Sequence, residues 1–375
     1  MYLKNGKYLN KDGKWVQNPG ILIKDGKIAK IGADFDEDII DCTGKLIFPG
    51  FVEAHCHTGL DEQDIGAIGQ GYNESGDPIE ADCRGIDGIN PFETGVNDAL
   101  MGGVTTMNTG PGSANVIGGT FCCMKTYGTC VDEMVIKRDS AMKIAFGENP
   151  MRFYGGFQKK SPYTRMKIAA LLRNYIYKAI EYKNDKDHKF DLGLEAFQKV
   201  INKEIPLKAH CHRADDIATA IRIAKEFDLN LTLDHVTEGH KIVDLIKDSG
   251  YSCIVGPSFG GRSKVELKDK SYETAGILAN AGVKVAIMTD STVIPLQNLP
   301  MCAMLAYQNG MKKEDAYKAI TINAAEIIGV EDRVGSIEVD KDADFAIFNS
   351  DFMEKADARC VMTIVDGVIR YSEEI

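Results

Sequence analysis

Two histidines separated by one residue, His55 and His57, stand at the end of an apolar run that begins at Pro49. The run predicts a strand, in which residues i and i+2 point to the same face. The two imidazoles therefore converge on one point, where they suit zinc or a similar divalent ion. The alternative is a pair of core or surface histidines, because histidine is a common polar residue as well as the commonest metal ligand.

Three later apolar runs also end in potential ligands. One carries His210 and His212, the next ends at His235, and the last ends at Asp290. Five of the seven histidines therefore fall at the ends of three predicted strands. This placement favours a hydrolytic metal site over five independently buried histidines. His210 and His212 share a face of their strand, so either could be the ligand.

The elements that must position these residues alternate between short apolar strands and helical stretches. This alternation predicts parallel βα units. Eight units suggest a (β/α)8 barrel, whose active site lies at the C-terminal ends of the strands. The longest helical stretch is expected at 164–201, and a loop over the site at 59–92. The eight strands are expected near 50–55, 103–109, 118–124, 141–147, 207–212, 229–235, 251–256 and 283–290.

Both ends of the chain consist of short strands broken by tight turns. Because the two ends share this style, we expect one small β-sandwich domain formed by residues 1–49 and 337–375. It would flank a metal-dependent (β/α)8 barrel hydrolase domain at 50–336. The turn signals, which are typical of hairpins, are Asn5-Gly6, Asp12-Gly13, Asp25-Gly26 and Asp366-Gly367.

Composition narrows the class of protein. The apolar fraction of 44% and the charged fraction of 26% are those of an ordinary soluble globular protein. The net charge of −11 argues against partners such as nucleic acid or an anionic membrane surface. The chain shows neither a signal segment nor an apolar run of transmembrane length.

Ten scattered cysteines predict free thiols in a reducing cytoplasm. The densest group, Cys122, Cys123 and Cys130, could be a structural metal site, but buried thiols are the favoured interpretation.

The chain resembles the amidohydrolase superfamily of metal-dependent hydrolases over essentially its whole length. Within that superfamily it is most similar to the imidazolonepropionase-like and prolidase-like branch. The stretches that carry the resemblance are the strand-one motif at 49–57, His210, His235 and Asp290 at the ends of strands five, six and eight, the closing helix at 321–329, and the return into the β-domain at 334–345.

The resemblance implies one or two divalent ions, with Zn²⁺ the expected metal. Many members with two metals bridge them with a carboxylated lysine from the fourth strand. Lys143 lies within that apolar strand, where an unmodified ammonium is costly to bury, and Glu148 lies nearer its end. We slightly favour Lys143 as the ligand; the alternative is a packed stem with its head turned outward. A site that uses neither residue would hold a single metal, as in imidazolonepropionase.

The family pattern favours His210 as the strand-five ligand, which leaves His212 to support the site or contact substrate. Arg213 beside it is a candidate clamp for a carboxylate. Arg152 and Arg262 also follow strand ends, and each could equally be a solvated loop charge. Arginines at the mouth would suit a small-molecule substrate with a carboxylate, such as an acyl amino acid, a dipeptide or a cyclic amide acid. The sequence is also compatible with assembly of the chain into a homo-oligomer.

The resemblance implies hydrolysis of an amide or cyclic amide C–N bond, non-peptide or dipeptide-like, by metal-activated water. Asp290 would bind metal, accept the water's proton and pass it to the leaving nitrogen. His235 or a neighbouring histidine would help to polarise the carbonyl. A rival reaction is deamination of a ring amidine, which the same residues would serve. A rival of another class is a catalytically silent barrel acting as a binding protein, which the intact ligand set argues against.

Overall fold

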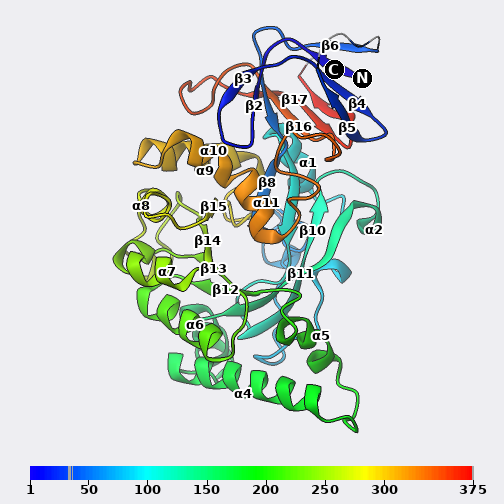
Figure 1. Ribbon diagram of the computed structural model, residues 1–375. Coiled ribbons are helices and arrows are strands. Elements are labelled where there is room, and N and C mark those ends of the chain that lie inside the picture. Colours follow the sequence, from blue (N-terminus) through cyan, green and yellow to red (C-terminus); the bar gives the residue numbers. More distant parts are fainter. Residues whose placement is uncertain (33–34, 36, 374–375) are drawn as a thin grey trace.

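The protein consists of a strand-and-helix barrel joined to a β-domain that is built from both ends of the chain (Figure 1). The computed structural model describes residues 1–32, 35 and 37–373. Both marked chain ends lie in the β-domain, and α4 lies at the opposite end of the molecule (Figure 1). The middle of the chain therefore forms the barrel, as the sequence pattern predicted.

Eight strands form the barrel sheet, in the order β15-β14-β13-β12-β11-β10-β9-β8. The sheet nearly closes on itself, and the His57 amide donates to the Ser291 carbonyl at 2.7 Å across the seam. The (β/α)8 fold class is thereby confirmed. The strands are β8 (Phe51–Cys56), β9 (Val104–Thr109), β10 (Ile117–Lys125), β11 (Val135–Ala145), β12 (Leu207–Cys211), β13 (Leu231–His235), β14 (Ser252–Val255) and β15 (Val285–Ile287).

One strand departs from the predicted parallel arrangement. The third strand, β10, runs antiparallel to both β9 and β11, whereas the other paired neighbours are parallel. Only residues 110–116 join β9 to β10. Because a parallel crossover needs roughly a dozen residues or more, this link can only turn the chain back. The expectation of eight parallel units was wrong at this strand.

The helices follow the chain around the barrel, and the stretch expected to be helical at 164–201 forms two of them. The Thr164 side chain caps the first through the Lys167 amide, and the Asp191 side chain caps the second through the Leu194 amide. The α-helices are α1 (Thr94–Met101), α2 (Val131–Met134), α3 (Glu148–Pro150), α4 (Arg165–Asn184), α5 (Leu192–Ile201), α6 (Ala214–Glu226), α7 (Val243–Ser249), α8 (Thr274–Asn280), α9 (Leu299–Gln308), α10 (Lys313–Ala319) and α11 (Ile322–Ile328). Short helices are η1 (Ala67–Gly69), η2 (Gly85–Asp87), the π-helix η3 (Met151–Gln158), η4 (Gly239–Lys241), η5 (Val265–Leu267) and η6 (Leu296–Asn298).

The terminal strands form two sheets of a β-sandwich, in the orders β5-β4-β1-β6 and β18-β17-β16-β7-β2-β3. Buried aliphatic and aromatic side chains such as Leu3, Ile47 and Phe345 fill the space between them. The strands are β1 (Tyr2–Lys4), β2 (Lys7–Leu9), β3 (Trp15–Gln17), β4 (Ile21–Lys24), β5 (Lys27–Ile31), β6 (Ile39–Asp41), β7 (Leu46–Pro49), β16 (Phe345–Phe348), β17 (Cys360–Val365) and β18 (Val368–Ser372).

Three of the four predicted hairpins form. Hairpins join β2 to β3, β4 to β5 and β17 to β18. The turn at Asn5-Gly6 also forms, with both residues at positive φ. It does not make a hairpin, however, because it carries the chain from β1 in one sheet to β2 in the other. The dipeptide thus predicted the tight turn correctly, but the pairing of the flanking strands depends on the packing of the two sheets.

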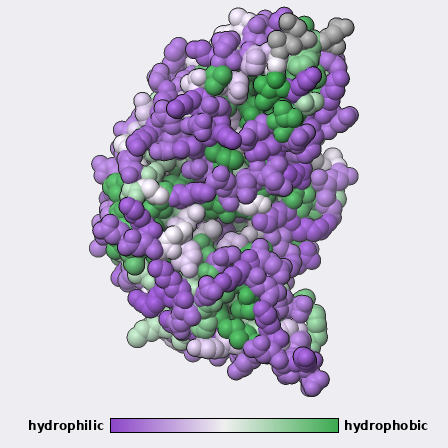
Figure 2. All heavy atoms as spheres, in the orientation of Figure 1, coloured by the Kyte–Doolittle hydropathy of each residue, from purple (hydrophilic) through white to green (hydrophobic). Residues whose placement is uncertain are grey.

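The surface is mostly hydrophilic over the face shown in Figure 2, with a hollow in its middle. None of the helices in the described part of the chain is long and apolar enough to span a membrane. All ten cysteines are free. Cys122 and Cys123 are buried whereas Cys130 is exposed, so the densest cysteine group does not share one environment.

Candidate metal centre

The predicted ligands lie together at the carboxyl ends of the barrel strands. His55 lies near the end of β8, His210 lies in β12, His235 ends β13, and Asp290 follows β15. The parallel register pairs His210 with Asp234, the residue before His235. The topology therefore brings to one place side chains that are up to 235 positions apart in the sequence, from His55 to Asp290.

The closest group joins the first and last strands of the barrel. The Asp290 Oδ1 lies 3.4 Å from His57 Nε2 and 3.5 Å from His55 Nε2. His55, His235 and Asp290 each offer a ligand atom within 4.8 Å of the others. Two ligands of a tetrahedral zinc ion, each bonded at about 2.0–2.2 Å, are about 3.4 Å apart. The spacing of the two histidines and the aspartate therefore fits one such ion.

Lys143 reaches the same group from β11. Its Nζ lies 3.3 Å from His55 Nε2, and the residue is fully buried. Burial lowers the pKa of its ammonium to about 8, because the charged form is poorly solvated there. The Lys143 head does not turn outward, as the alternative interpretation required; it faces the predicted ligands.

Buried charges hold these side chains in place. Asp234 Oδ2 lies 2.7 Å from His55 Nδ1 and 3.2 Å from Lys208 Nζ. Glu53 accepts hydrogen bonds from the His55 amide at 2.9 Å and from both the amide and the hydroxyl of Thr289, the residue before Asp290. Burial raises the pKa of Glu53 to about 7. These contacts fix how the predicted ligand His55 and the backbone before Asp290 are oriented, as partners of metal ligands do.

The backbone is strained at two of the predicted ligands. His235 and Asp290 both have positive φ, of 73° and 53°, and so does the β-branched Val236, at 53°. L-residues other than glycine rarely adopt this region, and such strain gathers at functional sites. The strand ends are therefore bent where the side chains of His235 and Asp290 join the other ligands.

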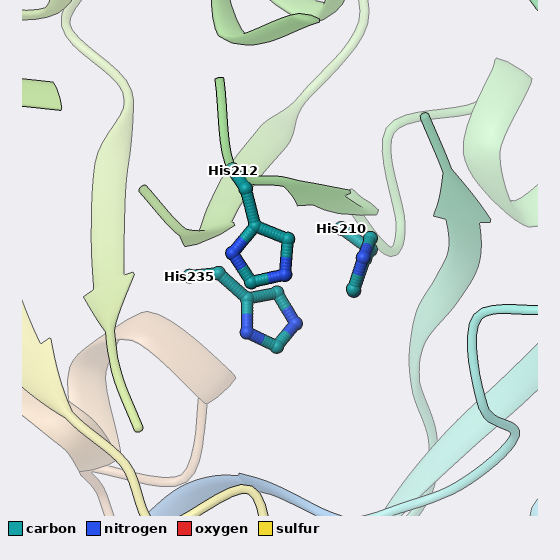
Figure 3. A group of neighbouring side chains, drawn as sticks. All are labelled: His210, His212 and His235. Atoms are coloured by element: carbon teal, nitrogen blue, oxygen red, sulfur yellow. The ribbon is translucent and has the colours of Figure 1, made fainter. Parts of the chain in front are cut away.

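A second group of histidines lies beside the first. His210, His212 and His235 each offer a ligand atom within 4.8 Å of the others, and Figure 3 shows the His212 and His235 rings next to each other with the His210 ring edge-on beside them. His212 Nδ1 lies 2.8 Å from Thr237 Oγ1, and His235 Nδ1 lies 3.0 Å from the Gly256 carbonyl. The carbonyl can only accept, so His235 carries its proton on Nδ1 and its Nε2 is free as a ligand. This tautomer suits a ligand better than a donor that polarises a carbonyl.

All three rings of this group are buried, and burial lowers the pKa of each histidine well below its ordinary value. They are therefore neutral imidazoles near neutral pH. Neutral imidazole is the form in which histidine binds metal ions. The neutral state of these three histidines is thus consistent with metal binding, as their close spacing is.

Glu148 does not join either group of histidines. Its amide donates to Glu266 Oε2 at 2.9 Å, and its own Oε2 faces the Glu266 amide at 3.4 Å. Between the two candidates from the fourth strand, the structure places Lys143 rather than Glu148 among the predicted ligands. Glu148 instead lines a cavity of about 440 Å³, together with residues such as Arg152 and Lys264.

The three predicted substrate-binding arginines have different surroundings. Arg213 makes a two-pronged ion pair with Asp215, at 3.0 and 2.9 Å. Arg262 is exposed. Arg152 lies 5.4 Å from the centre of the Phe157 ring and lines the cavity of about 440 Å³. Arg152 thus lines the same cavity as Glu148.

Two side chains at the site come from the connections between barrel strands and were not predicted. Tyr72, from the long loop over the barrel, stacks on the His57 ring at a centroid distance of 5.1 Å. Glu266, from the segment after β14, lies 3.8 Å from His212 Nε2 and 3.9 Å from His210 Nε2. No spacing rule links such loop residues to a strand end. A buried charge inside an apolar strand was a usable signal for Glu53, Lys208 and Asp234.

A barrel whose strand ends carry this set of histidines and acids defines a class, the metal-dependent hydrolases of (β/α)8 fold. The chain belongs to the amidohydrolase family, whose model matches residues 46–370. Members of this class act on carbon–nitrogen bonds. The predicted resemblance to this superfamily is confirmed.

Three similar proteins illustrate the match. A solved amidohydrolase from Thermotoga maritima is 38% identical, with a TM-score of 0.95 over 99% of this chain and 100% of that one. An imidazolonepropionase from Thermoplasma volcanium is 26% identical over 90% of this chain and 85% of its own. Amidohydrolase tasK from Hapsidospora irregularis is 24% identical over 95% of this chain, which spans only 40% of that protein. A solved Xaa-Pro dipeptidase and a solved putative prolidase from Bifidobacterium longum, each 16% identical, share the fold, with TM-scores of 0.60 and 0.58.

Proposed function

We propose that the protein hydrolyses an amide or cyclic amide C–N bond of a small molecule with the help of zinc. The observation that carries the proposal is the approach of His55, His57 and Asp290 at 3.4–3.5 Å, with Lys143 and His235 beside them. The imidazolonepropionase similarity supports the choice of reaction. The ten free thiols support a reducing, cytoplasmic setting.

Each residue of the site would have a distinct role in metal binding or proton transfer. A divalent ion, when bound, lowers the pKa of water and polarises a carbonyl. His55, His57 and His235 would hold it, and Lys143, carboxylated or as an amine, would lie beside it. Asp290 would accept the proton of the attacking water at its carboxylate and return it to the leaving nitrogen. Tyr72 stacks on His57 and would shield the site from bulk water.

The mouth supports a substrate that carries a carboxylate. Arg152 and Lys264 both line the cavity of about 440 Å³ next to Glu148, and apolar walls of Met151 and Val265 adjoin them. The Arg152 guanidinium at this cavity favours an anionic group, whereas Lys264 already lies 3.4 Å from the Glu266 carboxylate. Arg213 is less suited to this role, because Asp215 already pairs with it.

The test combines metal analysis with a substrate panel. Protein purified without chelator should contain one or two equivalents of a divalent transition metal, most of it zinc. It should turn over at least one acyl amino acid, dipeptide or cyclic amide acid, and chelation should abolish that turnover. Ammonia release from ring amidines would instead assign the rival deaminase reaction. Less than half an equivalent of every transition metal would refute the proposal.

A further inference from the structure

A cavity of about 540 Å³ lies where the barrel meets the β-domain. Its wall comes from the end of α1, from η6 and α9, and from the segment that joins β16 to β17. Figure 1 shows α9 on the side of the barrel nearest the β-domain. Pockets for small molecules usually measure about 300–1,000 Å³, so this cavity is large enough to hold one.

The wall of the cavity is mainly apolar and rich in methionine. Phe348 and Phe352 in this wall are buried, whereas Met101 and Met301 are 51% and 44% exposed. Met304 lines the cavity as well. Methionine side chains adapt their shape to apolar ligands, and exposed apolar side chains gathered at a hollow are typical of binding sites. The wall therefore suits a flexible apolar chain.

The charged residues of the wall leave one cation without a counter-ion. Glu354 pairs with Lys313, and Arg359 pairs with Glu373. Lys355 also lines the cavity and is exposed, and no carboxylate among the described residues makes an ion pair with it. An apolar wall with an unpaired ammonium at its edge is complementary to an amphipathic anion.

The cavity is separate from the candidate metal centre. Gly102 lines the cavity and lies just before β9, which begins at Val104. Gly110 follows the other end of this strand, and its carbonyl lies 2.8 Å from His57 Nδ1. A strand rises about 3.3 Å per residue, so the six residues of β9 alone span about 20 Å. A ligand in the cavity would therefore not touch the metal.

We propose that this cavity binds a medium-chain fatty acid. The alkyl chain lies against Met101, Met301 and Met304, and the carboxylate pairs with the ammonium of Lys355. This site goes beyond the proposed function and does not depend on it.

The same ligand would strengthen the junction between the two parts of the molecule. Phe348 and Phe352 line the cavity, and their rings pack against Phe51 at the start of β8, with centroids 5.8 and 5.7 Å away. A chain bound there contacts the barrel and the β-domain together. Because it binds the folded protein only, it should raise the temperature of unfolding.

The experiment measures fatty-acid binding by the full-length protein. Protein freed of bound lipid on a hydrophobic resin is titrated by calorimetry with hexanoate, octanoate and decanoate, each below its micelle concentration. One equivalent should bind, and the affinity should rise by up to about fourfold for each added CH₂ that is buried. Decanoate should also raise the temperature of unfolding. Protein stripped of metal with chelator should bind decanoate with the same affinity, because the metal is not part of this site.

The role of charge is tested on the ligand and on the protein. Decyltrimethylammonium has a similar chain and the opposite charge, and should bind at least about fivefold more weakly than decanoate. Lys355→Met should weaken decanoate by about fivefold, as loss of an ion pair at an exposed position allows, without weakening decan-1-ol. Lys178→Met changes an exposed lysine on α4 and is the matched control, which should bind decanoate as wild type does.

The role of the apolar wall is tested in the same way. Met301→Asp places a carboxylate beside the alkyl chain and should weaken decanoate by at least about tenfold, because the charge cannot be desolvated there without cost. Met166→Asp changes a methionine on α4 that is 79% exposed, and should leave the affinity unchanged. Thermal unfolding without ligand checks that each variant is folded.

Several outcomes would overturn the inference. They are the absence of saturable binding, an affinity that does not depend on chain length, and equal affinities for decanoate and decyltrimethylammonium. Loss of binding when the metal is stripped would place the fatty acid at the metal instead. A dimer in sedimentation that Met301→Asp dissociates would show that a second copy of the chain covers the cavity. None of these results bears on the proposed hydrolysis, which metal analysis and the substrate panel test separately.

Discussion

The Nδ1 of His55 lies 2.7 Å from Oδ2 of Asp234, the residue that precedes His235. Both side chains are fully buried, and the contact links β8 to β13 across the barrel. Because the carboxylate holds the Nδ1 proton, His55 must present Nε2 to Asp290 and Lys143. The same strand end thus supplies one predicted ligand, His235, and fixes the orientation of another.

We expect Asp234→Asn to weaken metal binding without removing a ligand. An amide no longer enforces the tautomer of His55, and loss of such a partner costs about 10–100-fold in metal affinity. Competition with a chromophoric chelator measures the affinity, and thermal unfolding of the stripped protein checks the fold. Asp244→Asn changes an acid in the first turn of α7 that is partly exposed; it is the control and should bind as wild type does. Equal affinities for the two variants would contradict this role of Asp234.

Lys125 should be essential to the junction between barrel and β-domain. Its Nζ lies 2.9 Å from Asp342, 2.6 Å from Asp344 and 3.1 Å from Asp366, and its side chain is only 3% exposed. Lys125→Met leaves the buried carboxylate of Asp344 without its counter-ion, which typically costs about 3–5 kcal/mol. Asp342 keeps its ion pairs with Lys27 and Arg333. Denaturant unfolding measures this loss.

Lys284→Met is the matched control for Lys125. Lys284 pairs with Glu326 at 2.6 Å, but its side chain is 49% exposed. Removal of a surface pair should change the free energy of unfolding by only about 0–1 kcal/mol. Similar losses in the two variants would show that burial of the Lys125 cluster has no special importance.

The barrel should depend on the β-domain for its stability. Phe48, Phe348 and Phe352 of the terminal segments pack against Phe51, with ring centroids 5.4–5.8 Å away, and Phe48 and Phe352 also contact Tyr317. A fragment of residues 50–336 loses the three terminal rings and exposes the other two. We expect it to bind a hydrophobic dye and to be poorly soluble. A fragment as stable as the full chain would show that the two parts fold independently.

The free thiols should differ widely in reactivity. Cys130 is exposed, Cys83 is partly buried, and the remaining eight of the ten cysteines are buried. Burial also raises the pKa of Cys83 to about 11, and the thiolate is the reactive form. In native protein, iodoacetamide should modify Cys130 fast and Cys83 slowly. Mass spectrometry after denaturation without reductant should find all ten thiols modifiable; fewer would indicate disulfides.

Much of the barrel could be predicted because strand ends mark themselves in the sequence. The apolar run before His55, His235 or Asp290 predicts a strand, and the polar residue at its end predicts where a metal ligand lies. The direction of β10 relative to its neighbours could not be predicted in this way, because its apolar pattern is the same whichever way the strand runs. The short link at 110–116 carried the missing information, since it cannot hold a crossover.

Two features of the site could not be predicted: the residues that reach it from the connections between strands, and which ring nitrogen of a histidine carries the proton. Tyr72 and Glu266 reach the ligands from segments whose path depends on the packing of the whole chain. The choice between the two nitrogens of His235 depends on Gly256, which belongs to the next strand's end. The sequence favoured Lys143 only slightly over Glu148 as the fourth-strand ligand, because the direction in which a side chain points depends on where the strand ends.

The last prediction concerns Asp290→Asn. The substitution keeps the shape of the side chain and an oxygen near His55 and His57, but an amide cannot accept the proton of water. If Asp290 moves that proton, kcat should fall by roughly 10²–10⁴, the usual contribution of a general base. Metal content should fall much less, because the histidine ligands remain. His55→Ala should instead lower metal occupancy directly, since it removes a ligand that lies 3.5 Å from Asp290. Elemental analysis and steady-state kinetics on the same samples separate the two effects. Near-normal turnover by metal-loaded Asp290→Asn would refute the role of Asp290 in proton transfer.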